Sequence, residues 1–437
     1  MVHLLFEIYN RFDLNYIDER GFTHFQAACS VPNGRELVVK FLQHGQNPNF
    51  FINGYSLLRS ALHNDTEWAA ELLRRGADPT YVDADGSTAL HTICRDGRVY
   101  LLNLVQVAVQ INVPDKKGDT PLHLALESGN TWASEILLER GADPNLVNAE
   151  GSTPLHIMCQ KTEGYKLVEI FFEIVDDIGK PVWVNVPDKK GNTPLHLAIH
   201  HKSTKKSEIL LVNGANPNWA DKDGCTALHL ICNTRRHEAM KRFFEIIDEN
   251  PQINLQIDAQ NKNGDTPLHM ALRLGSKKKF LILLEKGADP NVTNRYGWNA
   301  LHFICRKTTY DFIWHFFEIT DKIRRTVMID ARDSTGRTPL SLALLKANTK
   351  AAEVLLRKGA DPNFANKDGW TPLHFICVRC NWFLERFFRI NEERQQPVDI
   401  NAKTIKGTTP LKLLRNRMPI NYEEASRYLE QRGAELD

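Results

Sequence analysis

The chain alternates short polar turns with short apolar segments, and one nine-residue phrase opens most of these segments. At residues 191–199 the phrase reads Gly-Asn-Thr-Pro-Leu-His-Leu-Ala-Ile. Thr193 is a suitable N-cap because its hydroxyl can accept a hydrogen bond from a free backbone N–H, and Pro194 suits the first helical position. His196 stands three residues after the cap, where a polar side chain can reach back to it. With its leucine and alanine facing inward, the phrase predicts the start of a short helix.

A second phrase closes many of these units about twenty residues later. It reads Gly-Ala-Asp-Pro-Asn at 141–145, 287–291 and 359–363, and Gly-Ala-Asn-Pro-Asn at 214–218. Glycine after an apolar run is typical of a helix C-terminus, and a proline soon after it prevents the helix from continuing. Each unit is therefore predicted to contain a capped helix, a short turn, a second helix, a glycine stop and a polar turn.

Twelve turn glycines mark the units, at Gly21, Gly54, Gly86, Gly118, Gly151, Gly191, Gly224, Gly264, Gly297, Gly336, Gly369 and Gly407. The opening Gly-x-Thr-Pro-Leu-His-x-Ala and the closing Gly-Ala-Asp-x-Asn resemble the ankyrin repeat, a helix pair plus β-turn of about 33 residues. The resemblance implies an all-α solenoid of helix–turn–helix units joined by β-turn or hairpin loops. It also implies twelve repeats in one continuous array over residues 21–437, with the last repeat as the C-terminal cap and residues 1–20 as an N-terminal half-repeat cap.

From Gly86 onward two kinds of repeat alternate, so the period is a pair of repeats. Compact repeats read Pro-Leu-His-Leu-Ala or a close variant. The others mostly read Leu-His-x-Ile-Cys, often carry Phe-Phe-Glu-Ile in the second helix, and run about seven residues longer from Gly151 onward. This pattern resembles ankyrin arrays that grew by duplicating two repeats at once. The first two repeats diverge, with Gln26 and Arg59 in place of the motif histidine, as capping repeats commonly do.

Composition limits the function and the location. Lys and Arg total 55 and Asp and Glu total 53, a formal net charge of +2, which argues against wholesale binding to nucleic acid or to an anionic membrane surface. The N-terminus carries an early acid and no basic region, so no signal peptide is expected. No apolar run approaches the roughly 18 residues of a membrane helix, so no membrane insertion is expected. We expect a cytoplasmic protein, with the nucleus as the alternative.

Histidine and cysteine recur with the repeats, which favours structural roles. Eight of the sixteen histidines occupy the motif position at a helix start. Six of the eight cysteines recur two repeats apart, which is about 16–20 Å if packed helices are 8–10 Å apart, whereas a disulfide needs Cα atoms within about 7 Å. We therefore expect buried, reduced thiols at Cys29, Cys94, Cys159, Cys232, Cys305 and Cys377. The lysine run 277–279 is expected on a solvated helix face.

Motifs that carry chemistry are missing from the sequence. Cys377 and Cys380 form a lone pair with no second pair to complete a zinc site. No phosphate-binding loop, dinucleotide fingerprint or nucleophile elbow occurs. We expect neither catalysis nor a cofactor, a metal site or a small-molecule substrate.

The resemblance implies a non-enzymatic scaffold that binds another protein on the concave face formed by the turns and first helices. The alternative is a substrate-recognition adaptor of a larger complex such as a ubiquitin ligase. We favour the adaptor less because no adaptor-like segment stands outside the repeats. A monomer is expected.

Positions that project toward the concave face in the family become aromatic and basic in the C-terminal third of this chain. Exposed aromatic residues ringed by arginine have the composition of binding hot spots, so an acidic protein segment is the expected ligand. Scattered surface aromatics without a ligand, and nucleic acid stacked on the tryptophans, are the alternatives. The predicted partner-binding residues are Arg273, Tyr296, Trp298, Arg306, Lys307, Arg337, Lys346, Trp370 and Arg379.

Overall fold

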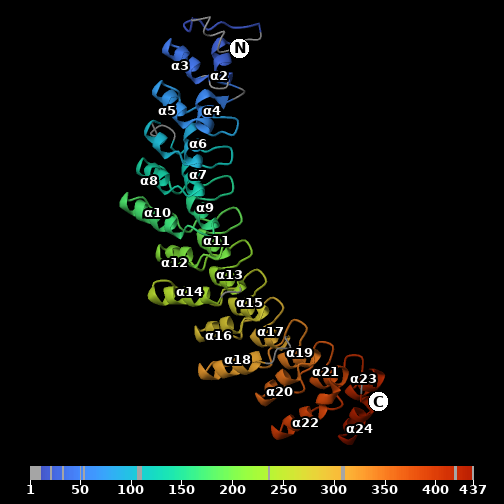
Figure 1. Ribbon diagram of the computed structural model, residues 1–437. Helices are drawn as coiled ribbons and strands as arrows, with labels where there is room; N and C mark the ends of the chain where they lie inside the picture. The colour runs from blue at the N-terminus through green and yellow to red at the C-terminus, as the bar shows by residue number, and fades with distance from the viewer. Residues whose placement is uncertain are drawn as a thin grey trace. The chain divides into compact units, whose positions relative to one another are not determined.

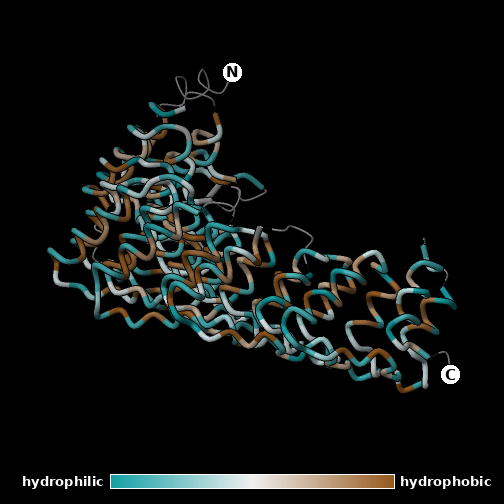
Figure 2. Tube along the Cα trace, turned by 90° about the horizontal axis from the view of Figure 1, so that it is seen from below, coloured by the Kyte–Doolittle hydropathy of each residue, from teal (hydrophilic) through white to brown (hydrophobic). Residues whose placement is uncertain are grey.

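The computed structural model describes residues 11–19, 22–31, 34–49, 51–52, 55–105, 111–234, 237–306, 311–417 and 421–435. Within these ranges the regular secondary structure consists almost entirely of short α-helices that follow one another in pairs and are joined by turns (Figure 1). Apolar and hydrophilic positions alternate along the helices (Figure 2). The chain divides into two compact units, residues 1–215 and 216–437. Most of the predicted half-repeat cap, together with Gly21 and Gly54, lies outside the described residues.

The described part of the first unit contains six helix pairs and one short hairpin. The hairpin pairs β1 (Phe51–Ile52) with β2 (Tyr55–Ser56) in antiparallel fashion. The helix pairs are α2 (His24–Ser30) with α3 (Arg35–Gln43), α4 (Leu57–Asn64) with α5 (Thr66–Arg74), α6 (Ala89–Asp96) with the 3-10 segment η1 (Val99–Asn103), α7 (Pro121–Ser128) with α8 (Thr131–Glu139), α9 (Pro154–Gln160) with α10 (Tyr165–Asp177), and α11 (Pro194–His200) with α12 (Thr204–Val212).

The described part of the second unit repeats the arrangement six times. Its helix pairs are α13 (Ala227–Asn233) with α14 (Glu238–Glu249), α15 (Pro267–Leu274) with α16 (Lys277–Glu285), α17 (Ala300–Arg306) with α18 (Asp311–Lys322), α19 (Pro339–Leu345) with α20 (Thr349–Arg357), α21 (Pro372–Arg379) with η3 (Asn381–Phe383) and α22 (Leu384–Glu393), and α23 (Pro410–Arg417) with α24 (Tyr422–Gln431). The predicted all-α repeat fold is confirmed in both units.

The alternation of repeat types is visible in the second helices. Helices α8, α12, α16 and α20 of the compact repeats each have 9 residues. Helices α10, α14 and α18 of the longer repeats have 13, 12 and 12 residues. Part of the extra sequence in the longer repeats therefore extends the second helix by about one turn.

In α6, α7, α9, α13, α17 and α21 the motif histidine joins the helix start to the following repeat. In the first unit, the Thr153 backbone N–H donates to His156 Nδ1 at 3.1 Å, and the two side chains also lie within hydrogen-bond distance. Because Nδ1 accepts this bond, the proton is on Nε2, which donates to the Asn192 carbonyl at 3.1 Å. His302 repeats the arrangement in the second unit, with Asn299 as the cap and the Arg337 carbonyl as the acceptor. These histidines are structural, as the sequence predicted.

The two divergent repeats replace this histidine in different ways. Gln26 forms a reciprocal capping box with Thr23, so an amide supplies the same local bonds. Arg59 instead forms an ion pair with Asp83, which lies in the turn of the next repeat. Both replacements keep a polar link at the helix start.

Neighbouring turns stack closely. The Arg295 backbone N–H donates to the Asn263 carbonyl at 3.0 Å. Gly264 has a φ of +72°, and a Cβ built on it would lie 2.8 Å from the Arg295 nitrogen. Glycine is therefore required here both for its backbone conformation and for the approach of the next turn.

All eight cysteines are free thiols. Five of the six periodic thiols are buried, at Cys94, Cys159, Cys232, Cys305 and Cys377. Cys29 is only half-buried because it lies in the first helix pair, so the prediction of burial is wrong for this residue.

Among the described residues two lysines are fully buried, Lys206 in α12 and Lys279 in α16. Lys206 Nζ donates to the carbonyls of Met158, Lys161 and Glu163 at 2.8, 2.7 and 2.6 Å, where α9 ends. Lys279 Nζ does the same at the end of α13, with Ile231 O at 2.7 Å and with Thr234. Each ammonium thus donates to carbonyls at and just beyond the C-terminus of a first helix, where backbone acceptors are in excess.

The expectation that the run 277–279 lies on a solvated face is therefore wrong for Lys279. Its side chain turns inward to the carbonyls that end α13. Burial lowers the pKa of both Lys206 and Lys279. The equivalent third positions of α8 and α20 hold Ala133 and Ala351.

The histidines predict a loss of stability in mild acid. Burial lowers the pKa of His229, His269 and His302 to about 4 in the folded protein, whereas an unfolded histidine titrates near 6.5. Unfolding takes up protons between these values, so the stabilisation is complete above about pH 6.5 and is lost as the pH falls toward about 4. Thermal melts between about pH 7 and pH 4.5 should show a falling Tm. The variant His229→Gln should reduce the slope, and an unchanged slope would contradict the assignment.

The buried ammonium of Lys279 predicts a second effect. Lys279→Met keeps most of the volume but removes the charged donor that binds the carbonyls of Ile231 and Thr234, so we expect a cost of about 1–3 kcal/mol. Chemical unfolding measures the loss, and hydrogen exchange should show faster opening at the end of α13. The control Lys277→Met alters a half-buried lysine of the same helix and should change stability by less than about 0.5 kcal/mol. Equal effects of the two variants would argue against the role given to Lys279.

Candidate functional site

A groove of about 650 Å³ lies in the second unit, between the turns and the first helices of three successive repeats. The turns around Gly264, Gly297 and Gly336 form one side. Helices α15, α17 and α19 contribute the other side. These are the elements that the family resemblance identifies as the concave binding face.

Six of the nine predicted partner-binding residues line this groove: Arg273, Tyr296, Trp298, Arg306, Arg337 and Lys346. Trp370 and Arg379 do not line it. Trp370 lies in the next turn, with its ring 5.2 Å from Phe375 and 6.0 Å from His374. Lys307 lies outside the described residues. The structure therefore brings together the central part of the predicted set.

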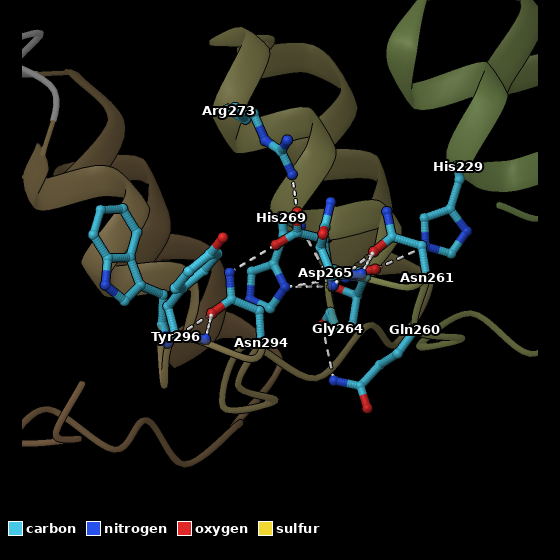
Figure 3. Close-up of polar contacts among 12 residues, drawn as sticks. His229, Gln260, Asn261, Gly264, Asp265, His269, Arg273, Asn294 and Tyr296 are labelled. Carbon is cyan, nitrogen blue, oxygen red and sulfur yellow. Dashed lines mark hydrogen bonds and ion pairs between the residues drawn. The ribbon is translucent and has the colours of Figure 1, made fainter. Parts of the chain in front are cut away.

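Asp265 holds one wall of the groove in place (Figure 3). Its side chain is 4% exposed and accepts from Arg273 of α15 and from Asn294 Nδ2 at 2.8 Å. Asn294 in turn accepts the backbone N–H groups of Tyr296 and Trp298, each at 3.0 Å. One buried carboxylate thus fixes an arginine and, through Asn294, the turn that carries both aromatic residues.

A second buried carboxylate fixes Arg337. Asp333 Oδ2 accepts from Arg337 Nε at 3.0 Å and Nη2 at 2.9 Å, and the Asp333 side chain is 0% exposed. Burial acts to raise the pKa of Asp333. Hydrogen bonds from Thr335 and Arg337 outweigh it and leave the pKa below its ordinary value. Asp333 is therefore ionised at neutral pH and orients the guanidinium beside the groove.

The aromatic residues of the groove differ in exposure. Tyr296 is 60% exposed. Trp298 is half-buried, since its ring packs edge-on against Phe303 with centroids 5.3 Å apart and the Arg306 guanidinium lies 5.3 Å above it. The expectation of an exposed aromatic is thus correct for Tyr296 and only partly correct for Trp298, which is also part of the support of the groove.

The groove has an apolar floor that the sequence prediction missed. Phe303 of α17 and Leu342 of α19 are buried, and Leu345 beside them is half-buried. Phe303 and Leu342 share a helix position that is mostly apolar in the other repeats, so the sequence pattern marked them as core. Leu345 stands at the position where α15 and α17 carry Arg273 and Arg306. Asp265 and Asn294 were also missed. The spacing from a turn aspartate to the asparagine of the next turn was the available signal.

The groove carries an excess of positive charge. Arg273, Arg306, Arg337 and Lys346 all line it, and among the described residues that line it Asp265 is the one carboxylate. Within the described part of the chain, neither Arg306 nor Lys346 makes an ion pair. The arrangement can bind an anion next to an apolar group.

The described residues offer neither a metal site nor a membrane span. No cluster of three or more histidine, cysteine, aspartate or glutamate side chains is placed to hold a metal ion there. In the same part of the chain no helix combines the length and the apolar character needed to cross a bilayer.

The family profile for ankyrin repeats, which spans three copies, matches residues 57–148, 136–221, 206–294 and 279–366. These matches cover more than half of the chain, which therefore belongs to the ankyrin repeat family. The repeats indicate protein partners. The helix pairs, capping histidines and stacked turns described above are the physical basis of this membership.

Several curated proteins are similar over large parts of the chain. The human protein "Transient receptor potential cation channel subfamily A member 1" is 26% identical over 297 residues, which are 67% of this chain and 26% of that protein. The Arabidopsis thaliana "E3 ubiquitin-protein ligase KEG" is 27% identical, over 67% of this chain and 18% of that protein. The chicken "Nuclear factor NF-kappa-B p105 subunit" is 26% identical, over 57% and 23%. The chain spans about a fifth to a quarter of the length of these relatives.

The role of Asp265 predicts a measurable loss of stability. Asp265→Ala removes the acceptor of both Arg273 and Asn294, and we expect a cost of about 1–3 kcal/mol because a buried donor loses its partner. Urea unfolding measures the change. The control Asp223→Ala alters an exposed turn aspartate and should stay within about 0.5 kcal/mol of the wild type. Similar values for both variants would contradict the assignment.

Proposed function

We propose that the protein is a non-enzymatic scaffold that binds a partner protein in this groove and that the partner presents an acidic segment. The observation that carries the proposal is the groove itself. Four cationic side chains and an exposed tyrosine surround an apolar floor on the face where turns meet first helices. Aromatic and arginine side chains around a desolvated centre are typical of binding hot spots.

The charge pattern supports an acidic rather than a neutral segment. Arg306 and Lys346 are exposed and would gain carboxylate partners on binding, whereas Arg273 and Arg337 are already oriented by Asp265 and Asp333. Orientation of a donor before binding reduces the entropy that is lost in the complex. The groove would therefore hold the segment with two fixed and two adjustable cations.

The alternative function is a substrate-recognition adaptor of a larger complex. The similarity to a relative named as an E3 ubiquitin-protein ligase favours this alternative. Both functions use the same groove, and they differ in what else is bound. Ligase subunits should co-purify with an adaptor and should be absent from the complex of a simple scaffold.

A pull-down with matched variants tests the proposed function. The bait is the full chain as wild type, as the groove variant Tyr296→Ala/Lys346→Gln, or as the control Trp314→Ala/Lys322→Gln. The control removes an aromatic residue that is 60% exposed and a lysine, both in α18 and away from the groove. Mass spectrometry should find partners that the wild type and the control retain, that the groove variant loses, and that elute as salt is raised.

With a purified partner, Tyr296→Ala should cost more than about 1 kcal/mol of binding free energy. The thermal melt of this variant should match that of the wild type, because Tyr296 is largely exposed. Partners that bind the groove variant as well as the wild type would place the site elsewhere.

A further inference from the structure

We infer that the acidic group recognised by this groove is a phosphorylated tyrosine of the partner. The inference rests on the proposed function for the location of the site and adds the chemistry of its ligand. It follows from the charge, the volume and the apolar floor of the groove taken together.

Two of the four cations that line the groove already have carboxylate partners. Arg273 is paired with Asp265, and Arg337 with Asp333. Arg306 and Lys346 remain, two positive charges that line one cavity without a carboxylate partner among the described residues. A phosphomonoester carries close to two negative charges at neutral pH and presents three strong acceptor oxygens. One such group would neutralise both remaining cations.

The arrangement of hydrogen-bond donors in the groove also fits a phosphate group. Arg337 uses Nε and Nη2 for Asp333, and its Nη1 has no hydrogen-bond partner within the described residues. Guanidinium groups match phosphate oxygens in pairs, and an arginine held by a carboxylate keeps its orientation when the ligand is absent. The groove therefore offers a fixed donor at Arg337 and adjustable donors at Arg306 and Lys346.

The apolar floor distinguishes phosphotyrosine from other anions. Trp298, Phe303 and Leu342 line the same cavity as the cations, so the ligand needs an apolar body and an anionic end. A volume of about 650 Å³ lies within the roughly 300–1,000 Å³ of sites that enclose small molecules. A phenyl ring against the floor with its phosphate at the cations satisfies both requirements in one side chain. Two carboxylates of an extended segment would come from residues about 7 Å apart and would leave the floor without a partner.

The test is a calorimetric titration of the full chain with N-acetyl-phosphotyrosine amide. The comparison ligands are N-acetyl-tyrosine amide, N-acetyl-phosphoserine amide and inorganic phosphate. Phosphotyrosine amide should bind at least roughly tenfold more tightly than each of the three, because only it combines the ring with the dianion. The double variant Arg306→Gln/Lys346→Gln should weaken this binding by at least about tenfold, and Trp314→Ala/Lys322→Gln should leave it unchanged.

Several outcomes would overturn the inference. They are the absence of saturable binding, equal binding of inorganic phosphate, and equal affinity of the wild type and the double groove variant. A glutamate-rich peptide without phosphate, titrated in parallel, separates the two proposals. If it binds and is lost in the double variant while phosphotyrosine amide does not bind, the proposed function stands and the inference falls.

Discussion

The stability of both units depends on one interaction that is repeated along the chain, the imidazole that is bonded at both nitrogens. Nδ1 of His156 accepts a backbone N–H at its own helix start, and Nε2 donates to a carbonyl of the next repeat. The first bond fixes where the helix begins, and the second fixes the next turn against it. Local structure and the stacking of repeats are thus set by the same ring. This arrangement explains why neutral histidine is buried so regularly in a chain with no catalytic motif.

The helix pairs were predictable because their signals are local. A Thr-Pro start, a glycine stop and a polar turn act within a few residues of where they stand, and the structure places α11, α15 and α19 at the positions that these signals indicate. The longer repeats were recognised by their Leu-His-x-Ile-Cys and Phe-Phe-Glu-Ile motifs and by their length. Their extension of α10, α14 and α18 by a turn required the structure, because nothing in the sequence distinguishes a longer helix from a longer loop there.

The sequence identified groove residues only at positions where the repeat motif does not require a particular type of residue. Tyr296 and Arg306 stand at positions that face the partner surface in the family, so their departure from the common small or polar residues was informative. Phe303 and Leu342 gave no such signal, because the same apolar type at the same position fills the core in other repeats. The burial of Trp298 could not be predicted either, since it depends on Phe303 and Arg306 from the following helix. Trp370 shows the limit of the approach, because an equivalent position in the next repeat does not line the groove.

The buried lysines restrict how such an array can be rearranged. Lys206 and Lys279 each belong to a compact repeat, and each ammonium is held by carbonyls that a longer repeat supplies at the end of its first helix. Loss of a pair of repeats would leave every lysine facing a longer repeat. Loss of only the longer repeat that precedes such a lysine would place the buried ammonium against a compact repeat with a shorter connection, at the energetic cost of an unpaired interior charge. A chain with this chemistry can change its length in steps of two more easily than in steps of one.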